Sequence, residues 1–80
     1  MRTCTYDEFI VAYHNIKATN PSYRLGQHFI NCFIKDSTTP NMQKLWNNKS
    51  QSDCVTSIML IMQDYKWDYR SMPLLENAPC

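Results

Sequence analysis

The chain has 80 residues, a formal net charge of +1 and 44% hydrophobic residues, which suits one small domain and leaves no room for two. An aromatic content of 12% beside only 19% charged residues excludes intrinsic disorder. The near-neutral net charge argues against non-specific electrostatic binding to nucleic acid or to an anionic membrane. The single glycine argues against an all-β fold, which needs many tight turns.

Two helices are predicted in the first part of the chain. The first begins after Thr5, which can form a capping box with Glu8 three residues later. Apolar residues then recur at helical spacing, and Pro21 ends this helix by Asn20. The second helix is expected to begin at once, with Asn20 as its N-cap and Pro21 in its first position, and to run to about Lys35.

The second predicted helix is apolar on two sides. At 100° per residue, one face carries Leu25, Phe29, Cys32 and Phe33, and the nearly opposite face carries Tyr23, Ile30 and Ile34. Such a helix lies in the centre of a core or takes part in an interface. Gly26 costs about 1 kcal/mol inside a helix, a cost that a close helix-helix crossing at this position would explain.

Two further helices are predicted in the second part of the chain. A short one starts at Pro40, and a longer one runs from Ser50 or Ser52 to about Asp68 with an apolar stripe wider than one partner helix needs. No helical pattern follows, so residues 69–80 are expected to form either a strap packed on the domain or a mobile tail.

These elements predict an all-α fold in which residues 1–80 form a single helical domain, a compact bundle of three longer helices and one short helix. The surplus apolar surface of the second and fourth helices favours self-association, most simply as a two-fold dimer. The N-terminus lacks the apolar core of a signal peptide, and no apolar run approaches the roughly 20 residues that span a bilayer. A cytoplasmic protein without a membrane partner is therefore expected.

The four cysteines, Cys4, Cys32, Cys54 and Cys80, show no CxxC spacing, so the sequence contains no zinc knuckle or redox motif. Without a signal peptide the thiols are expected to be reduced, with Cys32 and Cys54 as small buried apolar residues. Phosphate-binding loops, dinucleotide fingerprints and metal-carboxylate motifs are also missing from the sequence, so no cofactor or metal is expected.

The stretch Asn20-Pro21-Ser22-Tyr23-Arg24-Leu25-Gly26-Gln27-His28-Phe29-Ile30-Asn31, preceded by Phe9 and Tyr13, resembles a pattern in small uncharacterised open reading frames of tailed bacteriophages. Those proteins combine an opening helix that carries Phe and Tyr with a second helix of the Asn-Pro-x-x-Arg-x-Gly-Gln type. The resemblance covers roughly residues 5–35. It implies an accessory factor in the host cytoplasm that binds and redirects a host enzyme or blocks a host defence.

A polar row on the second helix is the main candidate for partner binding: Arg24, Gln27, His28, Asn31 and Lys35. Its donors suit a phosphate, a carboxylate or an acidic protein surface, whereas the alternative is a solvated face with Arg24 paired to an acidic neighbour. Trp67 and Tyr69 are candidate anchors because aromatic residues are enriched in interface hot spots. Core packing and base stacking are the alternatives for these rings.

His28 and Cys32 are four residues apart, so both project from adjacent turns of one helix. Such a pair can act as a nucleophile or hold a metal. No second histidine or acidic pair accompanies it in the sequence, and the helical wheel places His28 at the border of the apolar face. A packed cysteine beside a border histidine is therefore the preferred interpretation.

The favoured function is that of a non-enzymatic phage-type protein that inhibits or redirects a host factor by steric blocking, the host factor being a defence complex, a nuclease or the transcription machinery. The alternative is a small-ligand or nucleotide-binding module in which an oligomer sequesters an anionic ligand. An enzyme that uses Cys32 and His28, and a protein that binds nucleic acid directly, rank below these two.

Overall fold

The computed structural model describes residues 2–76 and 78, so Cys80 and the end of the expected tail lie outside the described residues. Its elements in chain order are β1 (Thr3–Cys4), α1 (Tyr6–Thr19), α2 (Leu25–Phe33), α3 (Pro40–Asn47), α4 (Gln51–Asp64) and β2 (Met72–Pro73). Four helices dominate the structure, which confirms the expected helical fold. The two short strands are an addition that the sequence did not predict.

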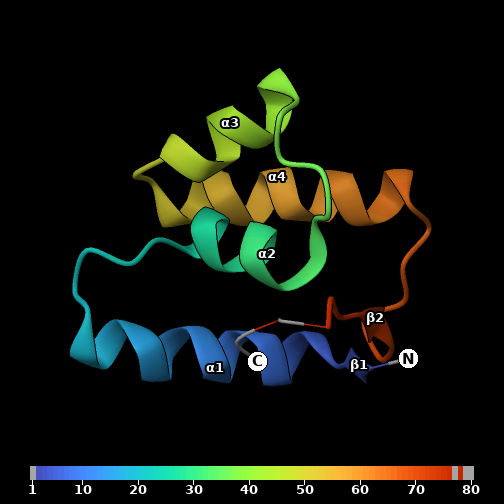
Figure 1. The fold of residues 1–80 in the computed structure, drawn as a ribbon, viewed down its shortest axis with the longest axis horizontal. Coiled ribbons are helices and arrows are strands. Elements are labelled where there is room, and N and C mark those ends of the chain that lie inside the picture. Colours follow the sequence, from blue (N-terminus) through green and yellow to red (C-terminus); the bar gives the residue numbers. More distant parts are fainter. Residues whose placement is uncertain (1, 77, 79–80) are drawn as a thin grey trace.

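Helix α2 is the central element of the fold. It lies between α1 on one side and α3 and α4 on the other (Figure 1). The contact with α1 is aromatic: the Phe9 ring lies 4.9 Å from the His28 ring and 5.3 Å from the Phe33 ring, centroid to centroid. Seven of the nine residues of α2 are buried. Two layers of the same molecule therefore account for its two apolar sides, and the expected dimer stays a prediction.

Gly26 marks the point where α2 and α3 cross. A Cβ atom at this position would overlap the backbone carbonyl oxygen of Leu45 in α3, so only glycine fits. The expected close crossing is confirmed. The thiol groups of Cys32 and Cys54 are buried, as expected, and Cys54 enters the same crossing from α4.

The start of α1 is fixed by the expected capping box. The Glu8 amide donates to the Thr5 hydroxyl at 3.1 Å, and the Thr5 amide donates to the Glu8 carboxylate at 2.9 Å. A third amide of this end is satisfied from far along the chain, because the Tyr6 N–H donates to the Tyr69 carbonyl at 2.7 Å. The helix start therefore also holds the segment that follows α4.

The prediction that the second helix begins at Pro21 is wrong, because α2 begins at Leu25. The Tyr23 amide donates to the Asn20 carbonyl at 3.0 Å, and the Ser22 hydroxyl donates to the Asn20 side chain at 2.9 Å. These bonds close a turn over the Asn-Pro pair, which favours turns as well as helix starts. Arg24 is extended and serves as the N-cap, and at the other end Ile34 is extended, so the helix also stops before Lys35.

The fourth helix ends at Asp64, four residues before the predicted end. Lys66 follows with a φ of 56°, its amide donates to the Gln63 carbonyl, and the Trp67 amide donates to the Met62 carbonyl at 2.9 Å. This pair of bonds is a Schellman ending, in which glycine usually holds the left-handed position. The turn sends the Trp67 ring back onto the core at 5.8 Å from the ring of Phe33, centroid to centroid.

The described part of the chain after Asp68 is a strap across the domain. Strands β1 and β2 pair antiparallel, with Thr3 opposite Pro73 and Cys4 opposite Met72, whose side chain is fully buried. The Leu75 amide then donates to the Cys32 carbonyl at the end of α2 at 2.9 Å. Within the described residues, none of the helices has both the length and the apolar character that crossing a bilayer requires.

Candidate functional site

The polar row expected on the second helix does not form one surface. Asn31 and Lys35 are exposed, whereas Arg24 and Gln27 are half-buried. His28 has an exposed fraction of 0%, so its placement at the border of the apolar face is wrong. The reason is that α1 packs along this side of α2 and covers the imidazole. A fully buried side chain does not reach a partner in this conformation, which removes His28 from the candidate contact residues.

His28 lies in a closed polar cluster within the core. The Tyr23 hydroxyl is 2.7 Å from His28 Nδ1, and Cys32 Sγ is 3.6 Å from His28 Nε2. The Phe9 ring is stacked on the imidazole. The helical spacing correctly predicts that the His28 and Cys32 side chains lie next to each other, but both are fully buried. Among the described residues, no three His, Cys, Asp or Glu side chains gather in a way that could hold a metal ion.

Arg24 contacts backbone rather than the acidic residue considered for it. Its Nη1 donates to the carbonyl of Asn47, the last residue of α3, at 3.2 Å. Cations are favoured at this end of a helix because the last carbonyls are unpaired and the helix dipole is negative there. The contact ties the start of α2 to the end of α3.

The two predicted aromatic anchors lie in a cluster of large side chains at the end of α4. We call this cluster the aromatic ridge and define it as Tyr6, Met59, Tyr65, Trp67 and Tyr69. The Tyr65 and Trp67 rings are stacked with centroids 5.1 Å apart, and the Tyr69 ring meets the Tyr6 ring edge-on at 6.0 Å. The Tyr69 hydroxyl donates to the sulfur of Met59 at 3.2 Å.

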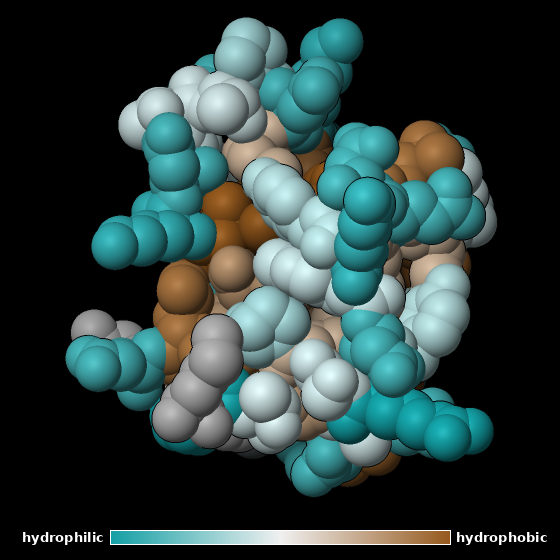
Figure 2. Space-filling model, turned by 90° about the vertical axis from the view of Figure 1, so that its right-hand side faces the viewer, coloured by the Kyte–Doolittle hydropathy of each residue, from teal (hydrophilic) through white to brown (hydrophobic). Residues whose placement is uncertain are grey.

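The aromatic ridge is accessible although its rings are mutually supported. Tyr65 is 52% and Tyr69 is 49% exposed, whereas Trp67 is half-buried against α2. Figure 2 looks onto this end of the molecule, where surfaces of intermediate hydropathy occupy the middle of the face and strongly hydrophilic side chains surround them. Burial first, and then the neighbouring Tyr69 and Asp7, raise the pKa of the Tyr6 hydroxyl above its usual value.

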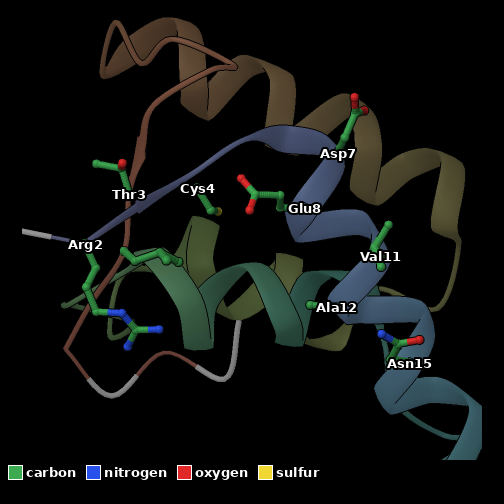
Figure 3. A pocket seen from close by; sticks show the side chains of 9 residues that line it. Arg2, Thr3, Cys4, Asp7, Glu8, Val11, Ala12 and Asn15 are labelled. Carbon is green, nitrogen blue, oxygen red and sulfur yellow. The ribbon is translucent and has the colours of Figure 1, made fainter.

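A groove of about 640 Å³ lies beside the ridge, between β1, the first turns of α1 and Leu74 (Figure 3). Its walls carry Arg2 on one side and Asp7 and Glu8 on the other, and Val11 is 58% exposed within it. The charges are of both signs and Glu8 is engaged in the capping box. No motif in the sequence pointed to this groove, because it exists only once the strap lies beside β1.

The sequence predicts contact roles for two members of the ridge, Trp67 and Tyr69, but not for the other three. Tyr6 and Met59 fall at helical spacing with the apolar residues of their helices, which predicts core positions for both. Both residues are far from Tyr69 along the chain, so the sequence does not show that they form one cluster. The cluster depends on the turn after α4 and on the hydrogen bond from the Tyr6 amide to the Tyr69 carbonyl. Comparisons of the chain with models of protein families, with curated proteins and with solved structures find no match.

Proposed function

We propose that this protein acts without catalysis, by binding a second protein through the aromatic ridge and covering a site that the second protein needs. In the setting implied by the phage resemblance, the second protein is a host factor, such as a defence complex, a nuclease or part of the transcription machinery. Steric blocking needs only a rigid surface of sufficient size, which suits a chain of 80 residues.

The observation that supports the proposal is an exposed set of aromatic rings that are already held in place. The Tyr65 ring is fixed by stacking on Trp67, and Tyr69 is fixed by its hydroxyl bond to Met59 and by its carbonyl bond from Tyr6. Rings held in this way lose little conformational entropy on binding, so more of their contact free energy appears as affinity. Tyrosine and tryptophan are also the residues most enriched in hot spots.

The charges around the aromatic ridge favour a protein partner over a nucleic acid. The exposed charges of this segment alternate in sign: Asp64, Lys66, Asp68 and Arg70. Base stacking on a single strand is normally combined with a positively charged groove that follows the phosphates. Here the positive and negative charges cancel, whereas protein interfaces combine aromatic centres with a mixed polar rim.

The test compares two surface variants with the unmodified protein. Tyr65→Ala combined with Tyr69→Ala removes the exposed rings and keeps Trp67, which packs on the core. Leu60→Ala removes an exposed apolar side chain of α4 outside the ridge, where Leu60 is 58% exposed, and serves as the matched control. Each protein is immobilised, bacterial proteins are captured at moderate salt, and the retained proteins are identified and quantified by mass spectrometry.

A protein that the unmodified chain and the Leu60 variant retain equally, and that the double tyrosine variant binds at least about 30-fold more weakly, supports the proposal. Circular dichroism confirms that both variants remain folded. Equal retention by the double tyrosine variant would contradict the role of the ridge.

The accessible end of the polar row adds a separate test. Asn31 and Lys35 remain exposed, so they stay in the proposed contact surface, whereas Arg24 is engaged with Asn47. Lys35→Glu reverses one charge without disturbing a described contact. Weaker capture of the same protein by this variant would extend the contact surface to α2, and unchanged capture confines the surface to the ridge.

A further inference from the structure

A second pocket, of about 250 Å³, is lined by residues of the α1–α2 and α3–α4 connections. Both connections lie at the end of the molecule opposite the C-terminal end of α4 and the aromatic ridge (Figure 1). The floor of the pocket is made of buried side chains: Tyr13, Leu25 and Cys54. None of the residues proposed to contact the second protein lines it: Tyr65, Tyr69, Asn31 and Lys35. The two features are therefore independent.

The walls of this pocket carry three cations from three separate segments. Lys17 comes from the last turn of α1, Arg24 from the start of α2, and Lys49 from the α3–α4 connection. No aspartate or glutamate is among the described residues that line the pocket, so the lining carries three positive charges in a chain whose net charge is only +1. Charges of one sign gathered in a hollow attract a ligand of the opposite sign.

These cations are not neutralised by ion pairs within the described part of the chain. Lys17 Nζ lies 5.6 Å from the centre of the Tyr13 ring, a contact that leaves its charge intact. Arg24 Nη1 donates a hydrogen bond to the Asn47 carbonyl. This bond fixes the guanidinium and leaves its other N–H donors available. A fixed guanidinium fork matches the oxygen spacing of phosphate and carboxylate groups.

The start of α2 adds a positive field to the same pocket. Helix α2 begins at Leu25 in the pocket wall, and its N-cap Arg24 provides no side-chain acceptor for the first amides. Its first turn also contains no acidic residue. The positive end of the helix dipole favours an anion beside the three cations.

We propose that this pocket binds a phosphoryl group, either as inorganic phosphate or as the phosphate of a mononucleotide. The pocket is smaller than the about 300–1,000 Å³ typical of drug-sized ligands, so the recognised part is a compact anion. The Tyr23 ring in the wall offers a surface on which a base can stack outside the phosphate position.

The first experiment is an NMR titration of the full ¹⁵N-labelled chain with inorganic phosphate, with sodium chloride adjusted to hold the ionic strength constant. The expected result is a saturable shift of the amide signals of Arg24, Leu25 and Lys49, which line the pocket. A parallel titration with adenosine monophosphate distinguishes the sources of the phosphoryl group. Equal affinity assigns recognition to the phosphate alone, and tighter binding of the nucleotide adds stacking on Tyr23.

Two double variants of equal charge separate specific binding from general attraction. Lys17→Gln with Lys49→Gln removes two cations of the pocket, and Lys35→Gln with Lys44→Gln removes two exposed cations elsewhere. Loss of two charged contacts is expected to weaken phosphate binding at least about tenfold in the first variant, with little change in the second.

Two results would overturn the proposal: no saturable shift with either ligand, or equal affinity of the two double variants. Thermal melting of both variants checks that they remain folded. The double tyrosine variant of the aromatic ridge is expected to bind phosphate normally, so failure of the ridge proposal and failure of the pocket proposal give different results.

Discussion

Replacing Gly26 with alanine tests the crossing of α2 and α3. The added Cβ would overlap the Leu45 carbonyl oxygen and carbon, which belong to a helix backbone and cannot rotate away. Overpacking costs about 1–3 kcal/mol even where side chains can adjust. Against this, alanine gains up to about 1 kcal/mol in helix propensity. Because the backbone of α3 must move here, we expect an overpacking cost at the upper end of this range. The free energy of unfolding should then fall by about 2 kcal/mol in total.

This loss is a large share of the stability of a chain of 80 residues, for which the total is about 4–12 kcal/mol. It corresponds to a decrease in Tm of roughly 8–16 °C. Urea unfolding and thermal melting, both followed by circular dichroism, measure the change.

Asn31→Ala is the matched control, because Asn31 is exposed on the same helix and its replacement is expected to change stability by less than about 0.5 kcal/mol. A Gly26 variant that melts at or above the temperature of the unmodified protein would refute the reasoning. It would mean that α3 can shift without cost.

Lys66→Gly is expected to stabilise the protein by about 1 kcal/mol, because Lys66 holds a φ of 56° that glycine adopts freely. The expected rise in Tm is roughly 4–8 °C, and an unchanged Tm would contradict this prediction. Burial raises the pKa of the Cys54 thiol above its usual value of 9.0, so the folded state holds this proton more tightly than the unfolded state. The free energy of unfolding is therefore expected to be fully retained below pH 9 and to fall as the pH rises above it, with a shallower fall in Cys54→Ala. Urea unfolding between pH 8 and 10 measures this slope, and identical slopes would exclude Cys54 as its source.

Two helix starts with a local chemical signal, those of α1 and α3, were predictable from the sequence, whereas the similar signal at Asn20 and Pro21 closes a turn instead of starting α2. The Thr5 and Glu8 pair caps α1 as expected, and Pro40 opens α3. The bonds that define these starts join residues three positions apart, so the information lies within one turn of the chain.

The other errors occurred where contacts with residues distant in the sequence decide the structure. The α4 helix ends at Asp64 because the Trp67 ring packs on Phe29 and Phe33, and no glycine marks the turn. His28 is buried because Phe9 of α1 packs over its ring. A helical wheel of α2 alone cannot show this contact. The strands are two residues long, too short to show an alternating pattern.

The dependence on residues distant in the sequence also explains which candidate site residues could be predicted from the sequence. Trp67 and Tyr69 were recognised as aromatic residues suited to an interface, since their type alone carries that information. Lys17 and Lys49 have no feature in the sequence that distinguishes them from other lysines. Only the meeting of the α1–α2 and α3–α4 connections places them around one pocket with Arg24.

The pairing of β1 with β2 joins the beginning of the described chain to its end. During synthesis, residues 3 and 4 leave the ribosome long before their partners at 72 and 73 exist, so α1 lacks its Tyr69 acceptor until residue 69 has been synthesised. Closing so long a loop is also entropically unfavourable until the helices have condensed. We therefore expect ribosome-bound chains that stop short of β2 to be cleaved rapidly by proteases, and protection to arise abruptly once Pro73 has emerged.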